Sequence, residues 1–264
     1  SDLQQGGTPE RLLDKLFEAQ VIKTPMSDAL CFGDDPQWGP RWTYADVNDL
    51  AEVVSRILRE LGAVGADTVI GVSMAHKPEL IWTVIGILKV GAAWMPIQPG
   101  SPATRFESVV RQSRCNVIIT DDTSWTEVAL VKLPRCTVIC APLKSMPCVQ
   151  SHATTPANRL EGSLAYVLST SGSTGEPKLV GVEHGAVCRF MENWIREFFV
   201  NESPEGRPRR VLLSCNASFD ISVKLIFATL CSGGVLVVPD GNLGDSETLV
   251  KTIERQRVDY LFPV

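Results

Sequence analysis

Short apolar runs alternate with amphipathic stretches along almost the whole chain of 264 residues. Between residues 45 and 61 the apolar positions recur every three or four residues, the period of a helix with one buried face. Continuous apolar runs such as Thr68 to Met74 are typical of buried strands. Because strands alternate with helices, the sequence predicts an α/β fold with parallel sheets flanked by helices on both faces.

The pattern also gives the order of the elements. Predicted helices span Pro9 to Gln20, Ala45 to Leu61, Pro78 to Val90, Thr104 to Gln112, Val182 to Phe199, Phe219 to Leu230 and Ser246 to Arg255. Predicted strands are Ala29 to Phe32, Arg41 to Tyr44, Thr68 to Met74, Ala92 to Ile97, Asn116 to Thr120, Cys136 to Cys140, a run ending at Leu168, Arg210 to Cys215, Val235 to Val238 and Val258 to Phe262.

A stretch rich in proline and serine, Pro142 to Asn158, is the best linker candidate. We therefore predict two α/β subdomain regions, residues 1–160 and 161–264. The second is expected to be truncated, because only Pro263 and Val264 follow its last predicted strand.

The segment Leu164 to Lys178, LAYVLSTSGSTGEPK, carries the strongest chemical signal. An apolar strand runs into a loop of hydroxyl and glycine residues, which can bring donors close to phosphate oxygens. A helix predicted to begin at Val182 would add positive potential at its N-terminus. The candidate phosphate-binding residues are Thr170, Ser171, Gly172, Ser173, Thr174, Gly175 and Lys178.

Two known phosphate motifs do not fit this loop. A Walker P-loop requires G-x-x-x-x-G-K-[ST], whereas Gly172 and Gly175 are too close and Leu179 follows the lysine. A G-x-G-x-x-G fingerprint fails because the loop holds only two glycines. A flexible serine–glycine linker remains the simple alternative, but a position between an apolar strand and an amphipathic stretch disfavours it.

Composition narrows the function classes. The net charge of −5 gives no support for nucleic-acid binding or for an anionic membrane surface. No apolar stretch approaches the length of a transmembrane helix, and no signal peptide is visible. The eight cysteines form no C-x2-C pair and the three histidines are scattered, so we expect free thiols in a reducing, cytoplasmic setting and no metal site.

The loop belongs to a series of four segments. The four segments are Trp42 to Val47, Leu88 to Ile97, Leu164 to Lys178 and Asn216 to Ser222. In order and spacing they resemble the first four core motifs of the adenylation domains of nonribosomal peptide synthetases, members of the adenylate-forming superfamily. The resemblance extends from about Leu13 to Val264 and implies the large N-terminal lobe of such an enzyme.

The resemblance implies a reaction, cofactors and partners. An amino-acid carboxylate attacks the α-phosphate of ATP, which gives an aminoacyl adenylate and pyrophosphate, and the adenylate then passes to the phosphopantetheine thiol of a carrier domain. Loop hydroxyls and amides would stabilise the charge of the leaving pyrophosphate. The Thr174 hydroxyl would approach Mg²⁺, although no residue of this chain is assigned as a metal ligand. Condensation and carrier domains and a C-terminal adenylation lobe are the implied partners.

Phe219, Asp220 and Ile221 resemble the substrate-pocket motif, in which the aspartate pairs with the α-ammonium group of the amino acid. On local sequence alone, Asp220 fits equally well as the N-cap of the following helix. Lys224 lies one turn further along the same helix. The family resemblance makes it a selector of the substrate side chain and suggests an acidic or strongly hydrogen-bonding one. A lysine at a solvated edge is the alternative.

Several positions depart from the family pattern. Ser169 stands where an aromatic residue is usual, Leu179 where glycine is usual, and Gln98 where aspartate is usual. Asp46 and Val47 replace glutamate and leucine in the first motif. Leu179 is the most consequential departure, because a glycine there would ease a turn behind Lys178.

The later family motifs are not among these residues. They would supply the adenine and ribose contacts, an acidic Mg²⁺ ligand, the hinge and a catalytic lysine on the C-terminal lobe. We therefore expect this chain alone to be inactive and assign it no catalytic residue. The alternatives are an acyl- or aryl-acid ligase of the same superfamily and a non-catalytic, divergent module. The sequence does not identify the amino acid.

Overall fold

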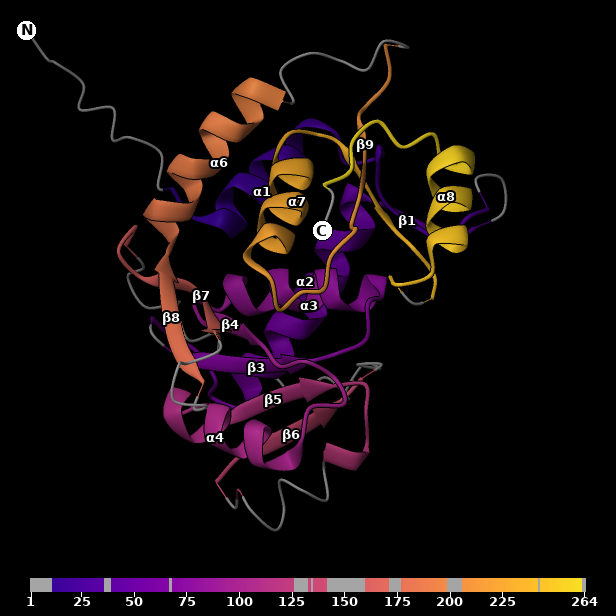
Figure 1. The fold of residues 1–264 in the computed structure, drawn as a ribbon. Helices are drawn as coiled ribbons and strands as arrows, with labels where there is room; N and C mark the ends of the chain where they lie inside the picture. The colour runs from indigo at the N-terminus through magenta and orange to yellow at the C-terminus, as the bar shows by residue number, and fades with distance from the viewer. Residues whose placement is uncertain are drawn as a thin grey trace, which may run out of the picture.

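Two β-sheets and the helices packed against them make up the described part of the protein (Figure 1). The computed structural model describes residues 11–35, 39–66, 68–125, 133, 135–141, 160–170, 177–198, 206–241 and 243–262. One sheet has six strands and the other has four. The α/β class with mainly parallel sheets, predicted from the alternation of elements, is confirmed.

The larger sheet has the strand order β6-β5-β3-β4-β7-β8. Its strands are β3 (Val69–Ser73), β4 (Ala93–Pro96), β5 (Val117–Thr120), β6 (Thr137–Cys140), β7 (Leu164–Thr170) and β8 (Lys178–Glu183). All neighbours pair in parallel except β7 and β8, which pair antiparallel. Every residue of β4 and β5 is buried, as expected for parallel strands covered on both faces.

The smaller sheet has the order β2-β1-β10-β9. It contains β1 (Asp28–Phe32), β2 (Arg41–Thr43), β9 (Arg210–Leu212) and β10 (Val235–Val238). Strands β1, β10 and β9 are parallel, and Leu30 of β1 lies opposite Leu236 of β10. Each sheet therefore takes strands from both sides of residue 160. The predicted division there does not separate the sheets, and as a description of domains it remains a prediction.

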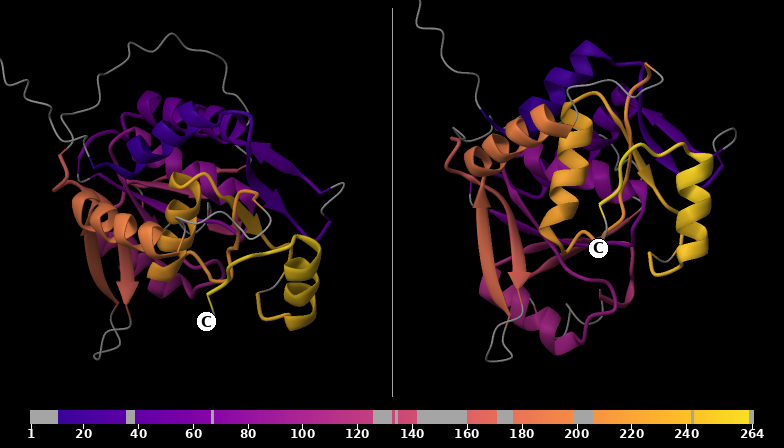
Figure 2. Two further views of the ribbon diagram at one scale, coloured as in Figure 1. Left: turned by 90° about the horizontal axis from the view of Figure 1, so that it is seen from above. Right: turned by 45° about the horizontal axis from the view of Figure 1, so that its top comes forward.

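Seven helices surround and separate the sheets within the described ranges. They are α1 (Leu13–Lys23), α2 (Tyr44–Glu60), α3 (Pro78–Lys89), α4 (Ala103–Ser113), α6 (His184–Phe198), α7 (Asp220–Cys231) and α8 (Ser246–Arg255). Helices α2 and α3 lie side by side between the two sheets, and α7 packs beside α1 and α6 (Figures 1 and 2).

The start of α2 shows why one departure in the first motif is harmless. The Thr43 side chain accepts a hydrogen bond from the backbone N–H of Asp46, and the Asp46 carboxylate accepts one from the Thr43 N–H at 2.8 Å. This reciprocal pair is a capping box, normally completed by glutamate or glutamine. Aspartate fills the same role here, so the replacement preserves the beginning of the helix.

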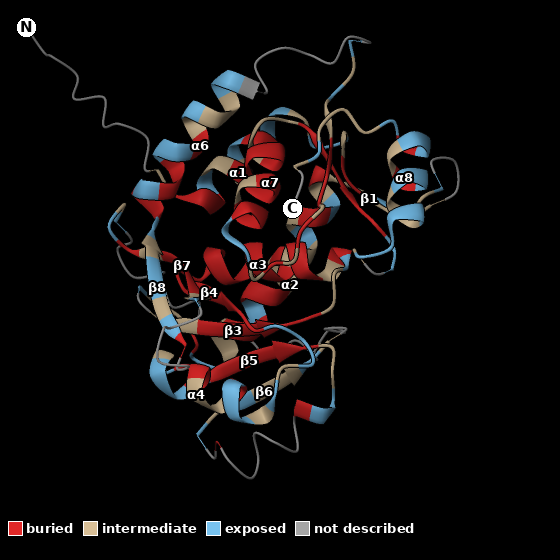
Figure 3. Ribbon diagram, in the orientation of Figure 1, coloured by how far each residue is buried: buried red, intermediate tan, exposed pale blue. Residues whose placement is uncertain are grey.

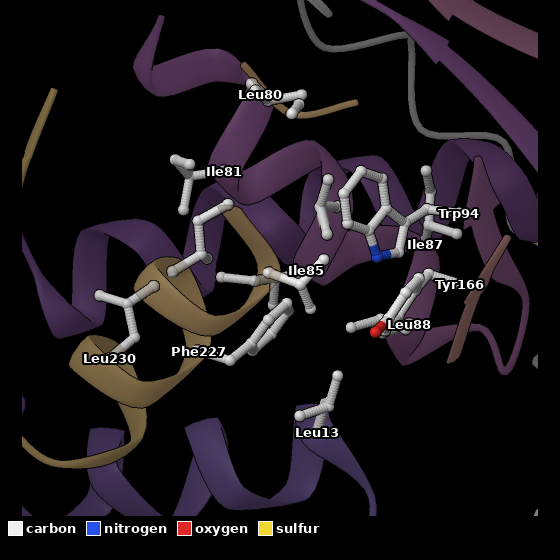
Figure 4. Close-up of a cluster of buried hydrophobic side chains, with 14 of the residues drawn as sticks. Leu13, Leu80, Ile81, Ile85, Ile87, Leu88, Trp94, Tyr166, Phe227 and Leu230 are labelled. Atoms are coloured by element: carbon white, nitrogen blue, oxygen red, sulfur yellow. The ribbon is translucent and has the colours of Figure 1, made fainter. Parts of the chain in front are cut away.

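Helix α3 is the centre of the hydrophobic core. Ten of its twelve residues are buried, and Figure 3 shows α3 and α7 mostly in the colour of buried residues. In Figure 4, Phe227 of α7 lies beside Ile85, and Trp94 of β4 lies near Ile87. Trp94 is fully buried, with its ring centroid 6.1 Å from that of Tyr166. The core therefore joins α3 to both the larger sheet and α7.

The last residue of α3, Lys89, has a buried ammonium group. The Lys89 side chain is 3% exposed, and its Nζ lies 2.6 Å from a Glu18 carboxylate oxygen and 2.7 Å from one of Glu52. Burial by itself raises the pKa of both carboxyl groups, but hydrogen bonds and positive charge outweigh it and hold each pKa below its ordinary value. The lowering comes from Lys15 and Lys89 at Glu18, and from Lys89, Ser55 and Arg59 at Glu52. The lysine thus links α1, α2 and α3 with both partners ionised.

The helix predicted to begin at Val182 in fact begins later. Residues 178–183 instead form β8, which pairs antiparallel with β7, and α6 begins at His184. Strand β8 lies at the edge of the larger sheet, and each of its residues is exposed or only partly buried. Its apolar residues 179–182 are therefore partly or largely exposed, as is common for a strand at the edge of a sheet.

Other boundaries differ slightly or lie outside the described residues. Val258 to Phe262 contributes only a single parallel bridge, from Tyr260 to Val211, in place of the predicted strand. The linker candidate Pro142 to Asn158 and the start of the first predicted helix fall outside the described residues. Among the described helices, none is both long and apolar enough to cross a membrane.

We predict that Gly86→Ala in α3 destabilises the protein. A Cβ at Gly86 would lie 2.6 Å from the Val54 Cβ and 2.7 Å from the Ala51 carbonyl oxygen of α2, so the two helices would have to separate. The free energy of unfolding should fall by about 1–3 kcal/mol, as measured by denaturant titration. Gly162→Ala is the control, because nothing lies within 4 Å of its added Cβ. Equal stability of both variants would contradict this close approach.

Candidate functional site

The ends of strands β7 and β8 define the base of the candidate phosphate loop. Thr170 lies opposite Lys178 in the antiparallel register, and the Thr170 hydroxyl donates a hydrogen bond to the Lys178 carbonyl oxygen at 3.3 Å. Both side chains belong to exposed residues. The other predicted phosphate-binding residues, Ser171, Gly172, Ser173, Thr174 and Gly175, lie outside the described residues.

The hairpin corrects the expectation that a helix N-terminus supports this loop. Helix α6 begins after the six residues of β8, beside the start of β7, where Glu183 lies opposite Leu164. Six residues of strand span roughly 20 Å. Because a helix dipole acts mainly within its first turn, α6 does not contribute to the loop, and Lys178 supplies positive charge there.

The hairpin also removes the concern about Leu179. This residue lies within β8, opposite Ser169, and packs against an apolar cluster that includes Phe106 and Ile118. An extended strand conformation is open to any L-residue, so a glycine is not required at this position. The departure from the family pattern costs nothing in the described backbone.

Asp220 begins α7 and does not cap it. The N-cap residue is Phe219, and no side chain makes a capping hydrogen bond at this end. The interpretation of Asp220 as the N-cap is therefore wrong. Its side chain is 63% exposed, so the carboxylate at the start of the helix is accessible to a ligand. Ile221, by contrast, is 9% exposed and belongs to the main core.

A cavity of about 420 Å³ brings the two motifs together. It opens at the carboxyl ends of the neighbouring parallel strands β4 and β7, the usual ligand position in α/β sheets. The predicted residues Thr170, Phe219 and Asp220 all line it, whereas Lys178, Ile221 and Lys224 do not. The full lining is Pro96, Ile97, Gln98, Ser101, Arg105, Phe106, Val109, Leu168, Ser169, Thr170, Ser218, Phe219 and Asp220.

The cavity wall formed by α4 was not predicted as part of the site. Arg105 is exposed on this helix and adds a cation to the cavity, while Phe106 is buried and stacks on Trp125 with ring centroids 4.0 Å apart. The sequence offered only the general rule that helices following parallel strands border such crevices. No local motif identifies Arg105 as a ligand-facing residue.

A second cavity of about 400 Å³ lies on the other side of Phe219, which lines both cavities. Phe219 is 55% exposed, an unusual exposure for a large aromatic residue. The second cavity is lined by His76, Ser214, Cys215, Asn216, Phe219, Gly241, Leu243 and Gly244. The fourth motif therefore faces two spaces, with its aromatic residue between them.

The groups beside Asp220 remain uncharged at neutral pH. Burial raises the pKa of the Tyr166 phenol and that of the Cys215 thiol to about 12 each, and the negative charge of Asp220 contributes to both shifts. Neither side chain neutralises the carboxylate. The cation paired with Asp220 is Lys224, whose Nζ lies 3.2 Å from Asp220 Oδ2.

Lys224 is directed toward α6. Its side chain is only 23% exposed, and its Nζ lies 4.7 Å from the ring centroid of Phe190 and 5.9 Å from that of Trp194. The solvated-edge alternative does not describe this lysine, which is held between a carboxylate and two aromatic rings. Its role as a selector of substrate side chains remains a prediction.

The described residues fit the phosphates of a nucleotide better than they fit a resident metal. Arg105 supplies a cation to the cavity lining, and Thr170 and Ser169 supply hydroxyl groups. Lys178 lies opposite Thr170 in the strand register, outside the lining itself. No group of three or more histidine, cysteine or acidic side chains in the described ranges forms a metal site. The seven described cysteines, like the pattern of the sequence, show free thiols.

Comparison with known proteins identifies the family and the fold. A family model described as AMP-binding enzyme matches residues 17–264. The chain is 36% identical over 236 residues to one component of the linear gramicidin synthase of Brevibacillus parabrevis, covering 88% of this chain but 4% of that protein. It thus spans a small part of this much longer relative.

Solved structures agree with that match. The AMPPNP-bound form of the nonribosomal peptide synthetase FmoA3 superposes with a TM-score of 0.77 at 27% identity, covering 96% of this chain and 25% of that one. An artificially fused adenylation–PCP di-domain, NpsA-ThdA from Klebsiella oxytoca, gives a TM-score of 0.78 at 22% identity, covering 97% of this chain and 48% of that one. The latter supports the fold alone.

We predict that His76 makes stability depend on pH. Burial lowers the pKa of this imidazole below 6.5, and its Nε2 lies 2.9 Å from the Leu213 carbonyl oxygen, which requires an N–H donor there. The unfolded chain therefore takes up the proton first as the pH falls below about 6.5, so this contribution is present above that pH and lost below it.

Denaturant titrations at about pH 7.5 and about pH 5.5 test this expectation. His76→Gln should reduce the loss of unfolding free energy between these two pH values by up to about 1 kcal/mol. The carboxyl groups paired with Lys89 titrate at lower pH and do not contribute in this window. An unchanged pH dependence in the variant would contradict the assignment.

Proposed function

The chain belongs to the family of AMP-binding enzymes, and on that premise we propose that it is the N-terminal part of an amino-acid-activating adenylation domain. The observation that carries the proposal is the single cavity lined by both Thr170 of the phosphate loop and Asp220 of the fourth motif. One ligand could therefore contact both. A nucleotide phosphate beside an amino acid satisfies the chemistry of each end.

In the proposed reaction, a carboxylate oxygen of the amino acid attacks the α-phosphorus of ATP. The bond from that phosphorus to the bridging oxygen breaks, and pyrophosphate leaves with its electron pair. Lys178 and the hydroxyl and amide groups of residues 170–175 would hold the β- and γ-phosphates and stabilise the charge that develops on them. Mg²⁺ would supply further charge neutralisation at the phosphates.

Asp220 would fix the amino acid at the other end of the cavity. Its exposed carboxylate is suited to accept charge-assisted hydrogen bonds from an α-ammonium group. This carboxylate favours an amino acid over a plain acyl or aryl acid, which has no cation to pair with it. The ligase alternative within the superfamily is correspondingly weaker.

A non-catalytic module is the second alternative, motivated by the departures at Ser169 and Gln98. Both residues line the cavity, so they alter the surface that a ligand would meet. The threonine, lysine and aspartate of the motifs are nevertheless retained in position. ATP binding without turnover in the complete domain would favour the non-catalytic alternative.

The partners follow from the proposed reaction. The adenylate would be transferred to the phosphopantetheine thiol of a carrier domain, with a condensation domain acting on the product and a C-terminal lobe completing the active site. The chain spans 4% of its linear gramicidin synthase relative, so these partners would be other parts of one longer synthetase. Free thiols are consistent with a cytoplasmic setting.

We expect the 264-residue chain alone to show no amino-acid-dependent exchange of pyrophosphate into ATP. By the family resemblance, the lysine that contacts the reacting groups belongs to the C-terminal lobe, and Lys178 serves the leaving phosphates instead. The purified chain would be assayed against a panel of amino acids beside the complete domain. Exchange by the isolated chain would show that this expectation is wrong.

In the complete domain, Asp220→Asn should raise the KM for the amino acid about tenfold or more. A hydrogen bond to a charged partner is worth about 1.5–3 kcal/mol, and the neutral amide cannot balance an ammonium charge. The KM for ATP should change by less than about twofold, because Asp220 does not contact phosphate in the proposed arrangement. Pyrophosphate exchange at varied substrate concentrations gives both constants.

Glu247→Gln is the matched control for this variant. Glu247 also lies in the first turn of a helix and pairs with a lysine four residues later, Lys251, at 2.7 Å. It lies outside both cavities that Phe219 lines. If the two variants behaved alike, Asp220 would not be a ligand-binding residue.

A further inference from the structure

Lys224 has two kinds of partner, and they lie on different helices. Its ammonium group pairs with Asp220 on its own helix, α7, at 3.2 Å. It also lies over the ring of Phe190 and near that of Trp194, both on α6. The two aromatic residues are one turn apart on α6, and their ring centroids are 5.6 Å from each other. Together they form an aromatic pair that faces the ammonium.

The two kinds of contact differ in strength. An ion pair between residues one turn apart on a helix is weak when a partner is exposed, and the Asp220 side chain is 63% exposed. A cation over an aromatic ring is held about twice as strongly or more, and the interaction grows when water is excluded. Lys224 is 23% exposed and meets two rings. The aromatic pair is therefore the stronger holder of the ammonium.

We propose that Phe190 and Trp194 are positioning residues. They hold the Lys224 ammonium when the ammonium group of a ligand replaces Lys224 as the partner of the Asp220 carboxylate. The inference rests on the proposed function, in which Asp220 binds the α-ammonium of an amino acid. In the free protein the Lys224 ammonium is hydrogen-bonded to Asp220 Oδ2, an oxygen of the carboxylate that the ligand ammonium would bind. The rings let the lysine give up that carboxylate without returning to bulk water.

The aromatic pair thus affects how strongly Lys224 competes with the ligand ammonium for the Asp220 carboxylate. A lysine tethered four residues from Asp220 acts as a competitor at an effective concentration of about millimolar or above. With the rings present, the ammonium keeps its two ring contacts when the ligand replaces it at the carboxylate. Without them, Asp220 is the best remaining partner of Lys224, and a free amino acid has to displace it. Phe190 and Trp194 therefore affect affinity without touching the substrate.

The test is a set of variants of the complete domain, assayed by pyrophosphate exchange. Phe190→Leu combined with Trp194→Leu should raise the KM for the amino acid about fivefold, with kcat and the KM for ATP changed less than about twofold. In a Lys224→Met background, which lacks the competitor, the same two leucine substitutions should leave the KM within about twofold of that of Lys224→Met alone. Phe190→Tyr with Trp194→Phe retains both ring faces and should leave the KM unchanged.

The Lys224→Met background separates positioning from a structural role. If loss of the rings merely disturbed α6, the leucine substitutions would raise the KM in this background as well, and the inference would be overturned. An unchanged KM in the leucine variant would also overturn it. Lys251→Met is the matched control, because Lys251 makes the same type of ion pair, with Glu247 on α8.

A second readout does not depend on activity. Lysines of the complete domain carrying ¹³C-methyl groups remain cationic, and the Lys224 signal, assigned by Lys224→Met, should show an upfield ring-current shift. Glycinamide, as an ammonium probe, should increase that shift in the wild type and not in the leucine variant. A domain that activates no amino acid but shows both effects would overturn the proposed function alone. Absence of the shift would overturn this inference whatever the activity.

Discussion

Burial of α3 between two sheets is the constraint on which the rest of the structure depends. A helix covered on both sides must be apolar around most of its surface, and ten of its twelve residues are buried. It contacts β3 and β4 of the larger sheet, β1 of the smaller sheet and the neighbouring α2. The close contact at Gly86 sets the distance between α3 and α2, and the ion pairs of Lys89 attach the C-terminal end of α3 to α1 and α2. The strands that carry the site are therefore held by one shared core.

The local sequence was sufficient for the parts of the fold that have strong patterns. The interior strands and α2 are apolar or amphipathic enough to be predicted within a few residues, and the family predicted from four motifs is confirmed by the match over residues 17–264. The sequence analysis missed strand β8, although residues 179–182 are apolar, because this edge strand is short and follows directly after the loop. The helix start was predicted within two residues, but β8 carries it to the far end of the hairpin, away from the loop.

The candidate site was predicted in part for a similar reason. Thr170 and Asp220 belong to motifs and were found, but Arg105 and Phe106 come from a helix whose nearness to the loop is set by sheet order. Only the pairing of β4 with β7 brings that wall into place. Likewise, the α7 sequence gave no sign that Lys224 would face aromatic rings on α6. Contacts between distant helices depend on packing and leave no period in either segment.

The environment of Cys215 has a consequence for the fidelity of the proposed chemistry. An acyl adenylate is an activated acyl donor, and any thiolate nearby would compete with the carrier thiol and end in a dead-end thioester on the enzyme itself. Cys215 lines the second cavity, which shares Phe219 with the candidate site, yet burial and the charge of Asp220 raise the pKa of its thiol to about 12. A protonated thiol is a poor nucleophile at neutral pH. Burial of Cys215, with a smaller contribution from the Asp220 charge, thus protects the domain from acylating itself.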